Sequence, residues 1–161
     1  MSIETNTCTA QSAWQRRYQP GYTELPGEGC GLSAEERLAQ DAMVRALLHR
    51  ELPAVQWHAI VAKYSINELE VRESIRWLIT RVETPAHHLF RMKSVMAWAV
   101  PKRSRRLPEG FYALHSWDNE GTPEPTLRRW RGGVGRWLDN QVGGAHASVE
   151  TILSRNGLTE R

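Results

Sequence analysis

Cysteine is scarce in this sequence, and long apolar runs are absent. Cys8 and Cys30 are the only cysteines among 161 residues. The first residues, MSIETNTCTAQSAW, have neither the basic start nor the apolar stretch of an export signal. We therefore expect free thiols in the cytoplasm rather than a disulfide. No stretch approaches the ~18 apolar residues that span a bilayer, so we expect no membrane partner.

The motifs of common catalytic sites are also missing. The sequence contains no G-x-S-x-G, no P-loop and no G-x-G-x-x-G after a strand pattern. Asp118, Glu120 and Glu124 could form the carboxylate group of a metal nuclease, but their setting favours a solvated turn. His87 and His88 lack the further ligands that a zinc site needs. We expect no enzyme, no metal site and no cofactor.

Basic charge is present but unevenly placed. The formal net charge is +3. Residues 86–161 carry twelve basic and seven acidic groups, whereas residues 1–85 carry nine and eleven. This asymmetry indicates a polyanion or an acidic protein surface as the partner of the C-terminal half.

Tryptophan is abundant. Seven occur, and they are spread along the chain rather than clustered. Because one indole buries a large apolar area, we expect most of them to anchor helix packing. The alternative is that one or two lie on a partner surface, where tryptophan is enriched. They are Trp14, Trp57, Trp77, Trp98, Trp117, Trp130 and Trp137.

The hydrophobic pattern predicts an all-α fold: a single small domain of five or six short helices, after an irregular N-terminal arm over residues 1–32. Residues 33–100 form the helical core, residues 101–121 a basic linker and aromatic loop, and residues 122–161 basic helices that pack on the core. Ser33 and Glu36 form a capping box that starts the first helix, which runs to Arg50.

The organising stretch is residues 52–82, which divides into two helices. Pro53 suits a helix start, and apolar residues recur at helical spacing as far as Tyr64. The period breaks at Ser65-Ile66-Asn67. Asn67 caps the second helix, with Glu70 as the partner of a capping-box-like pair. In that helix one apolar stripe is formed by Val71, Ile75, Leu78 and Val82.

Three further helices are expected after this pair. Thr84-Pro85 starts one that Pro101 ends, with Thr84 as the cap. Phe111–Trp117 is either a short strand or an aromatic loop, and residues 118–121 form a turn. Thr122-Pro123 opens a glycine-rich basic helix. Gly143-Gly144 then breaks the chain before a last short helix that ends at Asn156-Gly157.

The two helices of residues 52–82 have the dimensions of a helix-turn-helix, in which the second helix enters the DNA major groove. Glu68, Glu70 and Glu73 weaken this interpretation, because acidic groups meet phosphate badly, although glutamate can accept from cytosine N4. The alternative is a helical hairpin that only builds core. The expected DNA-binding residues are Arg72, Arg76, Arg81, Lys102, Arg103, Arg105, Arg106, Arg128, Arg129 and Arg131.

The segment from Leu52-Pro53 through Trp57-His58-Ala59-Ile60-Val61 to Tyr64-Ser65 resembles the start of the helix-turn-helix in sigma-factor region four. Small phage antitermination proteins of the Q type are similar in the same unit, in size and in all-helical pattern. The resemblance covers roughly thirty residues, and Ser65-Ile66-Asn67 replaces the usual apolar-glycine turn. It implies a phage or prophage transcription regulator in a bacterial host cell, with double-stranded DNA and RNA polymerase as partners.

A second hypothesis is a protein-interaction module, such as a phage inhibitor or adaptor of a host protein that binds no nucleic acid. Its interface would consist of exposed tryptophans and the glycine-rich helix, and the basic residues after Pro101 would meet an acidic partner.

Overall fold

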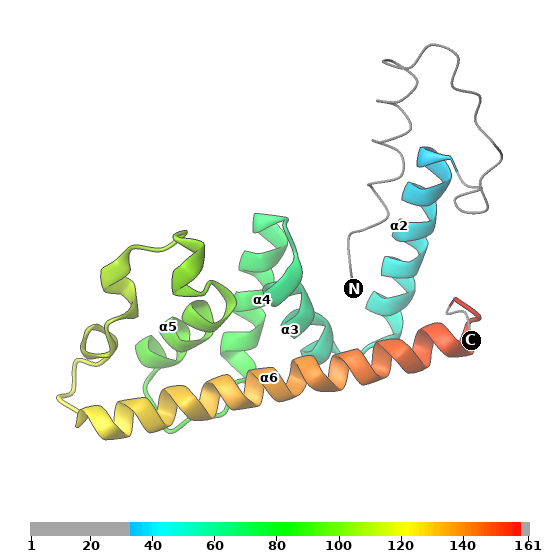
Figure 1. The fold of residues 1–161 in the computed structure, drawn as a ribbon. Helices are drawn as coiled ribbons and strands as arrows, with labels where there is room; N and C mark the ends of the chain where they lie inside the picture. The colour runs from blue at the N-terminus through cyan, green and yellow to red at the C-terminus, as the bar shows by residue number, and fades with distance from the viewer. Residues whose placement is uncertain (1–32, 159–161) are drawn as a thin grey trace, which may run out of the picture. The chain divides into compact units, whose positions relative to one another are not determined.

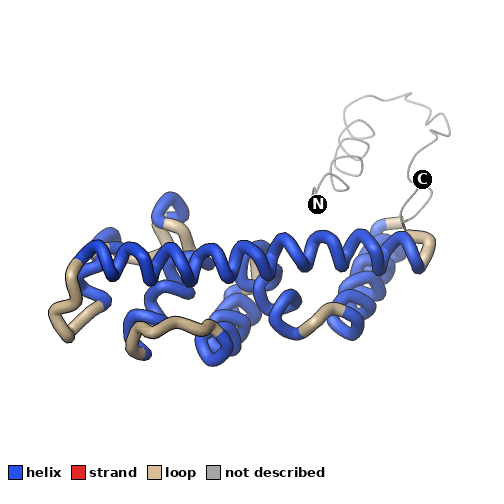
Figure 2. Tube along the Cα trace, turned by 90° about the horizontal axis from the view of Figure 1, so that it is seen from below, coloured by secondary structure: helices blue, strands red, loops and turns tan. Residues whose placement is uncertain are grey.

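The computed structural model describes residues 33–158, and these residues confirm the all-α prediction. Five α-helices and three short 3-10 helices occur among them. Figure 2 shows only helices and loops over this part of the chain, with no strand. Of the helices described, none is long and apolar enough to cross a membrane. The expected arm, with Cys8, Cys30 and Trp14, lies outside the described residues.

The chain divides after Leu47 into two units. The first helix, α2 (Ala34–Glu51), crosses this division. Its start confirms the predicted capping box. The Ser33 amide donates to Glu36 Oε2 at 2.7 Å, and the Glu36 amide donates to Ser33 Oγ at 3.2 Å. None of the residues of α2 is buried.

Helices α3 (Ala54–Tyr64) and α4 (Glu68–Arg81) are the predicted pair, and three residues separate them. Pro53 takes the N-cap position of α3. Asn67 caps α4 as predicted, since its Oδ1 accepts from the Leu69 amide at 3.0 Å. The Asn67 amide does not donate to Glu70, as a capping box would require. The amide donates to Ser65 Oγ at 3.1 Å, and the Ser65 hydroxyl donates to Glu70 Oε2 at 3.0 Å.

Helix α5 (His88–Ala99) starts later than the sequence predicts. His87 is its N-cap, because Nδ1 accepts from the Phe90 amide at 3.4 Å. Thr84 Oγ1 instead accepts from the Ala86 amide within a bend, so the expected cap at Thr84 was wrong. His87 is held in place by Asp118, whose Oδ1 lies 3.1 Å from Nε2. The predicted end before Pro101 is confirmed.

Three 3-10 helices follow: η2 (Lys102–Ser104), η3 (Glu109–Tyr112) and η4 (Leu114–Trp117). The aromatic stretch is therefore neither a strand nor an irregular loop. The predicted turn after it is confirmed. Asp118 Oδ2 accepts from the Thr122 amide at 2.7 Å, and Gly121 takes a positive φ of 75°.

The last helix, α6 (Glu124–Arg155), is one continuous rod of 32 residues. The expected break at Gly143-Gly144 was wrong, as was the expectation that all helices are short. The flanking Val142 and Ala145 are buried, so packing holds this region helical despite the low propensity of glycine. Gly157 takes a positive φ of 67° just beyond the Asn156 C-cap, as predicted. Figure 1 shows α3, α4 and α5 arranged side by side along α6.

Two apolar clusters stabilise this arrangement. The larger joins Ala62 of α3, the apolar stripe of α4, Val95 of α5 and Val134 and Leu138 of α6. The smaller cluster contains Ala86, Phe90, Trp117 and Leu127 and fixes η4 on the start of α6.

The described tryptophans confirm their predicted packing role. Trp117 is fully buried, and no tryptophan in residues 33–158 is exposed. Those that pack against the two clusters are Trp77, Trp98, Trp130 and Trp137.

Candidate nucleic-acid interface

The side of α4 that faces away from the core is exposed along its length. Its residues recur at i, i+3, i+4, i+7 and i+11, which places them on one side of a helix. We call this set the outer face of α4. Each of its members is exposed: Leu69, Arg72, Glu73, Arg76 and Thr80. Two of the predicted arginines, Arg72 and Arg76, therefore lie together on a surface that a ligand can reach.

Arg81, the third arginine predicted on this helix, projects from another side. It follows Arg76 by five residues, which is about 140° around an α-helix. Its guanidinium carbon lies 5.1 Å from the centre of the Trp77 ring, a cation–π contact. Arg81 is exposed, but it does not extend the outer face of α4.

Two of the three acidic residues that weaken the DNA hypothesis remain at the surface. Glu70 is half-buried and accepts a hydrogen bond from Ser65, so its carboxylate stabilises the α3–α4 turn. Glu68 and Glu73 are exposed. Glu68 forms an ion pair with Arg72 at 3.6 Å, which offsets part of the negative charge at the start of α4.

The predicted cluster of positive charge after Pro101 is exposed on and beside η2. We call Lys102, Arg103, Ser104, Arg105 and Arg106 the basic loop. Lys102 forms an ion pair with Glu109 at 2.7 Å, and this contact lowers the pKa of the Glu109 carboxyl. Arg105 takes a left-handed backbone conformation with φ of 55°. Within the described part of the chain, Arg103, Arg105 and Arg106 have no ion-pair partner, so their charges remain available.

A hollow of about 430 Å³ lies between the basic loop and the α3–α4 turn. Its lining includes Ser104 and Arg106 of the basic loop. It also includes Tyr64, Ser65 and Ile66, from the end of α3 and the following turn, and Val71 of α4. The fold therefore brings the basic loop and the turn before α4, which lie about forty residues apart in sequence, to one hollow.

The arginines of α6 form a separate group. Arg128, Arg129 and Arg131 are exposed on the first part of the helix. Arg128 donates through Nε and Nη2 to Glu124 Oε1, at 3.0 Å and 2.6 Å. The Arg131 guanidinium carbon lies 5.7 Å from the Trp117 ring. Arg129 is the one of these three arginines without such a contact in the described chain, so this group offers less available charge than the basic loop.

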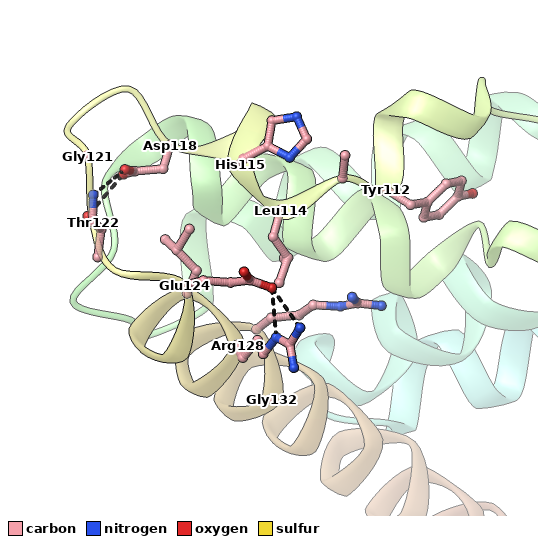
Figure 3. Close-up of a pocket in the computed structure, with 12 residues that line it drawn as sticks. Tyr112, Leu114, His115, Asp118, Gly121, Thr122, Glu124, Arg128 and Gly132 are labelled. Carbon is pink, nitrogen blue, oxygen red and sulfur yellow. Dashed lines mark hydrogen bonds and ion pairs between the residues drawn. The ribbon is translucent and has the colours of Figure 1, made fainter.

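Figure 3 shows the cavity beside this second group, which has a volume of about 830 Å³. His115, Thr122, Glu124 and Arg128 line it, together with Asp118. Hydrogen bonds from Thr122 and contact with His87 lower the pKa of the Asp118 carboxyl. These carboxylates already have partners, and no three His, Cys, Asp or Glu side chains come together as a metal site in residues 33–158.

The glycines of α6 make no close approach except at one point. A Cβ atom at Gly144 would lie 2.9 Å from Gln56 Nε2, whereas none at Gly132, Gly133 or Gly135 would meet any atom within 4 Å. The protein-interaction hypothesis relied on this glycine-rich helix and on exposed tryptophans. Each tryptophan in residues 33–158 is buried or half-buried.

Two apolar residues, one in the turn before α4 and one in its first turn, were not among the predicted site residues. Ile66 is 88% exposed and Leu69 is 68% exposed. The sequence carried a signal for Leu69, because it lies at i−7 from Arg76 and so off the apolar stripe. No signal distinguished Ile66, since a turn residue has no helical face.

No protein-family model matches this chain, and no curated protein or solved structure matches it at a significant level.

Proposed function

We propose that this protein is a DNA-binding transcription regulator that places α4 in the major groove and the basic loop on the adjoining phosphates. The observation that carries the proposal is the shared hollow that joins Arg106 to the turn before α4. In helix-turn-helix proteins the start of the second helix contacts base edges, while nearby cations hold the phosphates and set the register.

The outer face of α4 supports the same proposal. Its charged members, Arg72, Glu73 and Arg76, are side-chain types that hydrogen-bond to base edges. A helix of 14 residues is about 21 Å long, and one helix fits the width of the major groove. The arginines of α6 belong to a different part of the surface, and we assign them at most an outer phosphate contact.

Binding of the full chain to a labelled duplex, followed by fluorescence anisotropy, tests the proposal. The triple variant Arg103→Ala, Arg105→Ala, Arg106→Ala should bind at least tenfold more weakly, because three phosphate contacts are lost. Arg50→Ala is the matched control, since Arg50 is also exposed but lies at the end of α2. Equal loss in both variants, or no duplex binding by the unaltered chain, would overturn the proposal.

The resemblance to sigma region four and to Q-type proteins extends the proposal to a phage or prophage regulator of the antitermination type. In that role the chain would contact both promoter DNA and bacterial RNA polymerase. Purified RNA polymerase and the chain are both treated with nuclease and then mixed. The two should elute together during gel filtration. Separate elution would limit the function to DNA binding, and retention without duplex binding would favour the protein-interaction module.

A further inference from the structure

We infer that Ile66 and Leu69 recognise thymine methyl groups, so that this protein selects its DNA site in part through T·A pairs. The inference rests on the proposed function and names the chemistry by which that site discriminates between sequences. It starts from the two most exposed large apolar residues of the helix-turn-helix, at 88% and 68%.

Their position in the fold limits what they can contact. Leu69 is the first residue of the outer face of α4, one turn before Arg72 and Glu73. Ile66 lies in the turn just before it and lines the hollow that Arg106 shares. Both side chains therefore lie where a bound duplex would present base edges, with phosphates on the side of the basic loop.

The chemistry of the major groove provides one apolar partner. Of the four bases, only thymine places a methyl group there, at C5, and apolar side chains contact it. Leucine and isoleucine carry no donor or acceptor, so they cannot satisfy the polar edges of guanine or cytosine. Packing against a methyl group is the contact that removes both side chains from water.

A protein partner fits this patch less well. Two side chains are far fewer than the roughly 20–30 residues on each side of a stable protein interface. Tyr64, the third exposed apolar residue nearby, already packs its ring 5.9 Å from that of His146 on α6. The exposed residues around the patch include Arg72 and Arg76 as well as Glu68 and Glu73. The arginines of the basic loop, unpaired within the described chain, add the positive charge that suits a polyanion.

Substitution of deoxyuridine for thymine isolates this contact, because uracil keeps every hydrogen-bonding group and loses only the methyl. A pool of random-sequence duplex DNA is first selected for binding to the full chain. The recovered duplex is then synthesised with deoxyuridine at one thymine at a time. We expect affinity to fall about fourfold when a contacted thymine is replaced, which is the effect of one buried methyl group. Replacement of a thymine that the protein does not contact should leave affinity unchanged.

The double variant Ile66→Ala, Leu69→Ala should lose this discrimination and bind the thymine and uracil duplexes equally. Leu158→Ala, which also removes an exposed leucine, should retain it. If the duplex binds and every uracil substitution is neutral, the inference fails and the proposed function stands. Discrimination that persists in the double variant also overturns the inference. If no duplex is recovered from the pool, both fail.

Discussion

The indole Nε1 of Trp98 donates a hydrogen bond to Asp139 Oδ1 at 2.8 Å and so ties α5 to α6. The same carboxylate oxygen accepts from Lys63 Nζ of α3 at 3.2 Å. The Lys63 nitrogen also lies 4.6 Å from the centre of the Trp98 ring. One acidic side chain thus connects three helices at the surface of the bundle.

We predict that Asp139→Ala lowers the free energy of unfolding by about 1 kcal/mol, because the Trp98 indole loses its acceptor. The ion pair with Lys63 contributes little to this value, since the Asp139 side chain is 60% exposed. Asp139→Asn keeps an acceptor for the indole and should lose less than half as much. Urea unfolding followed by circular dichroism measures both. Equal midpoints for the alanine variant and the unaltered chain would exclude a stabilising role.

The stability of the bundle should depend on the protonation of His58. Its Nδ1 lies 3.1 Å from Ser74 Oγ, and its ring stacks on Trp77 with centres 4.5 Å apart. Burial, reinforced by nearby His49, lowers the pKa of His58 below the ordinary value of 6.5. The unfolded chain therefore binds the proton first as the pH falls.

This contribution is fully present above pH 6.5 and is lost as the pH falls from there towards the lower folded-state pKa. His58→Gln should flatten the fall in the urea midpoint between about pH 7.5 and pH 5.5. His115→Gln is the control, since it removes an imidazole that is exposed. An unchanged slope in His58→Gln would contradict the assignment.

Adjacent glycines in α6 should respond differently to alanine. Gly143→Ala should stabilise the bundle by about 0.5–1 kcal/mol, because its Cβ would meet nothing and alanine favours the helix. At Gly144 the new Cβ would lie 2.9 Å from Gln56 Nε2, so that side chain must move and part of the gain is lost. Thermal unfolding of the two variants compares them directly. A larger gain at Gly144 would contradict the close approach of α3 and α6.

Local signals in the sequence predicted the start of most helices. The Ser33–Glu36 capping box, the Asn67 cap and the Gly157 stop each act within a few residues, so sequence alone reveals them. Contacts between distant residues could not be predicted in this way. His87 caps α5 because Asp118, 31 residues later, holds its ring, and that contact displaced the expected cap at Thr84.

Neither the continuity of α6 nor the spatial grouping of the site residues could be predicted from local sequence. Burial of residues such as Val142 and Ala145 against the bundle outweighs the low propensity of the adjacent glycines. Ten cationic site residues were predicted from the sequence, but only the fold showed that they form separate groups. Arg106 lines a hollow together with the turn before α4, whereas Arg128 and Arg131 line a different cavity. The number of basic residues along the sequence could not show that they fall into these two groups in space.

The salt dependence of duplex binding tests the central claim most directly. Affinity of the full chain for the selected duplex is measured by fluorescence anisotropy from about 50 to 200 mM salt. Contacts from Arg103, Arg105 and Arg106, with up to two more from α4, predict a log–log slope between about −2.7 and −4.5, at roughly −0.9 for each neutralised phosphate. A slope near zero, or one that the triple alanine variant of the basic loop leaves unchanged, would contradict the account.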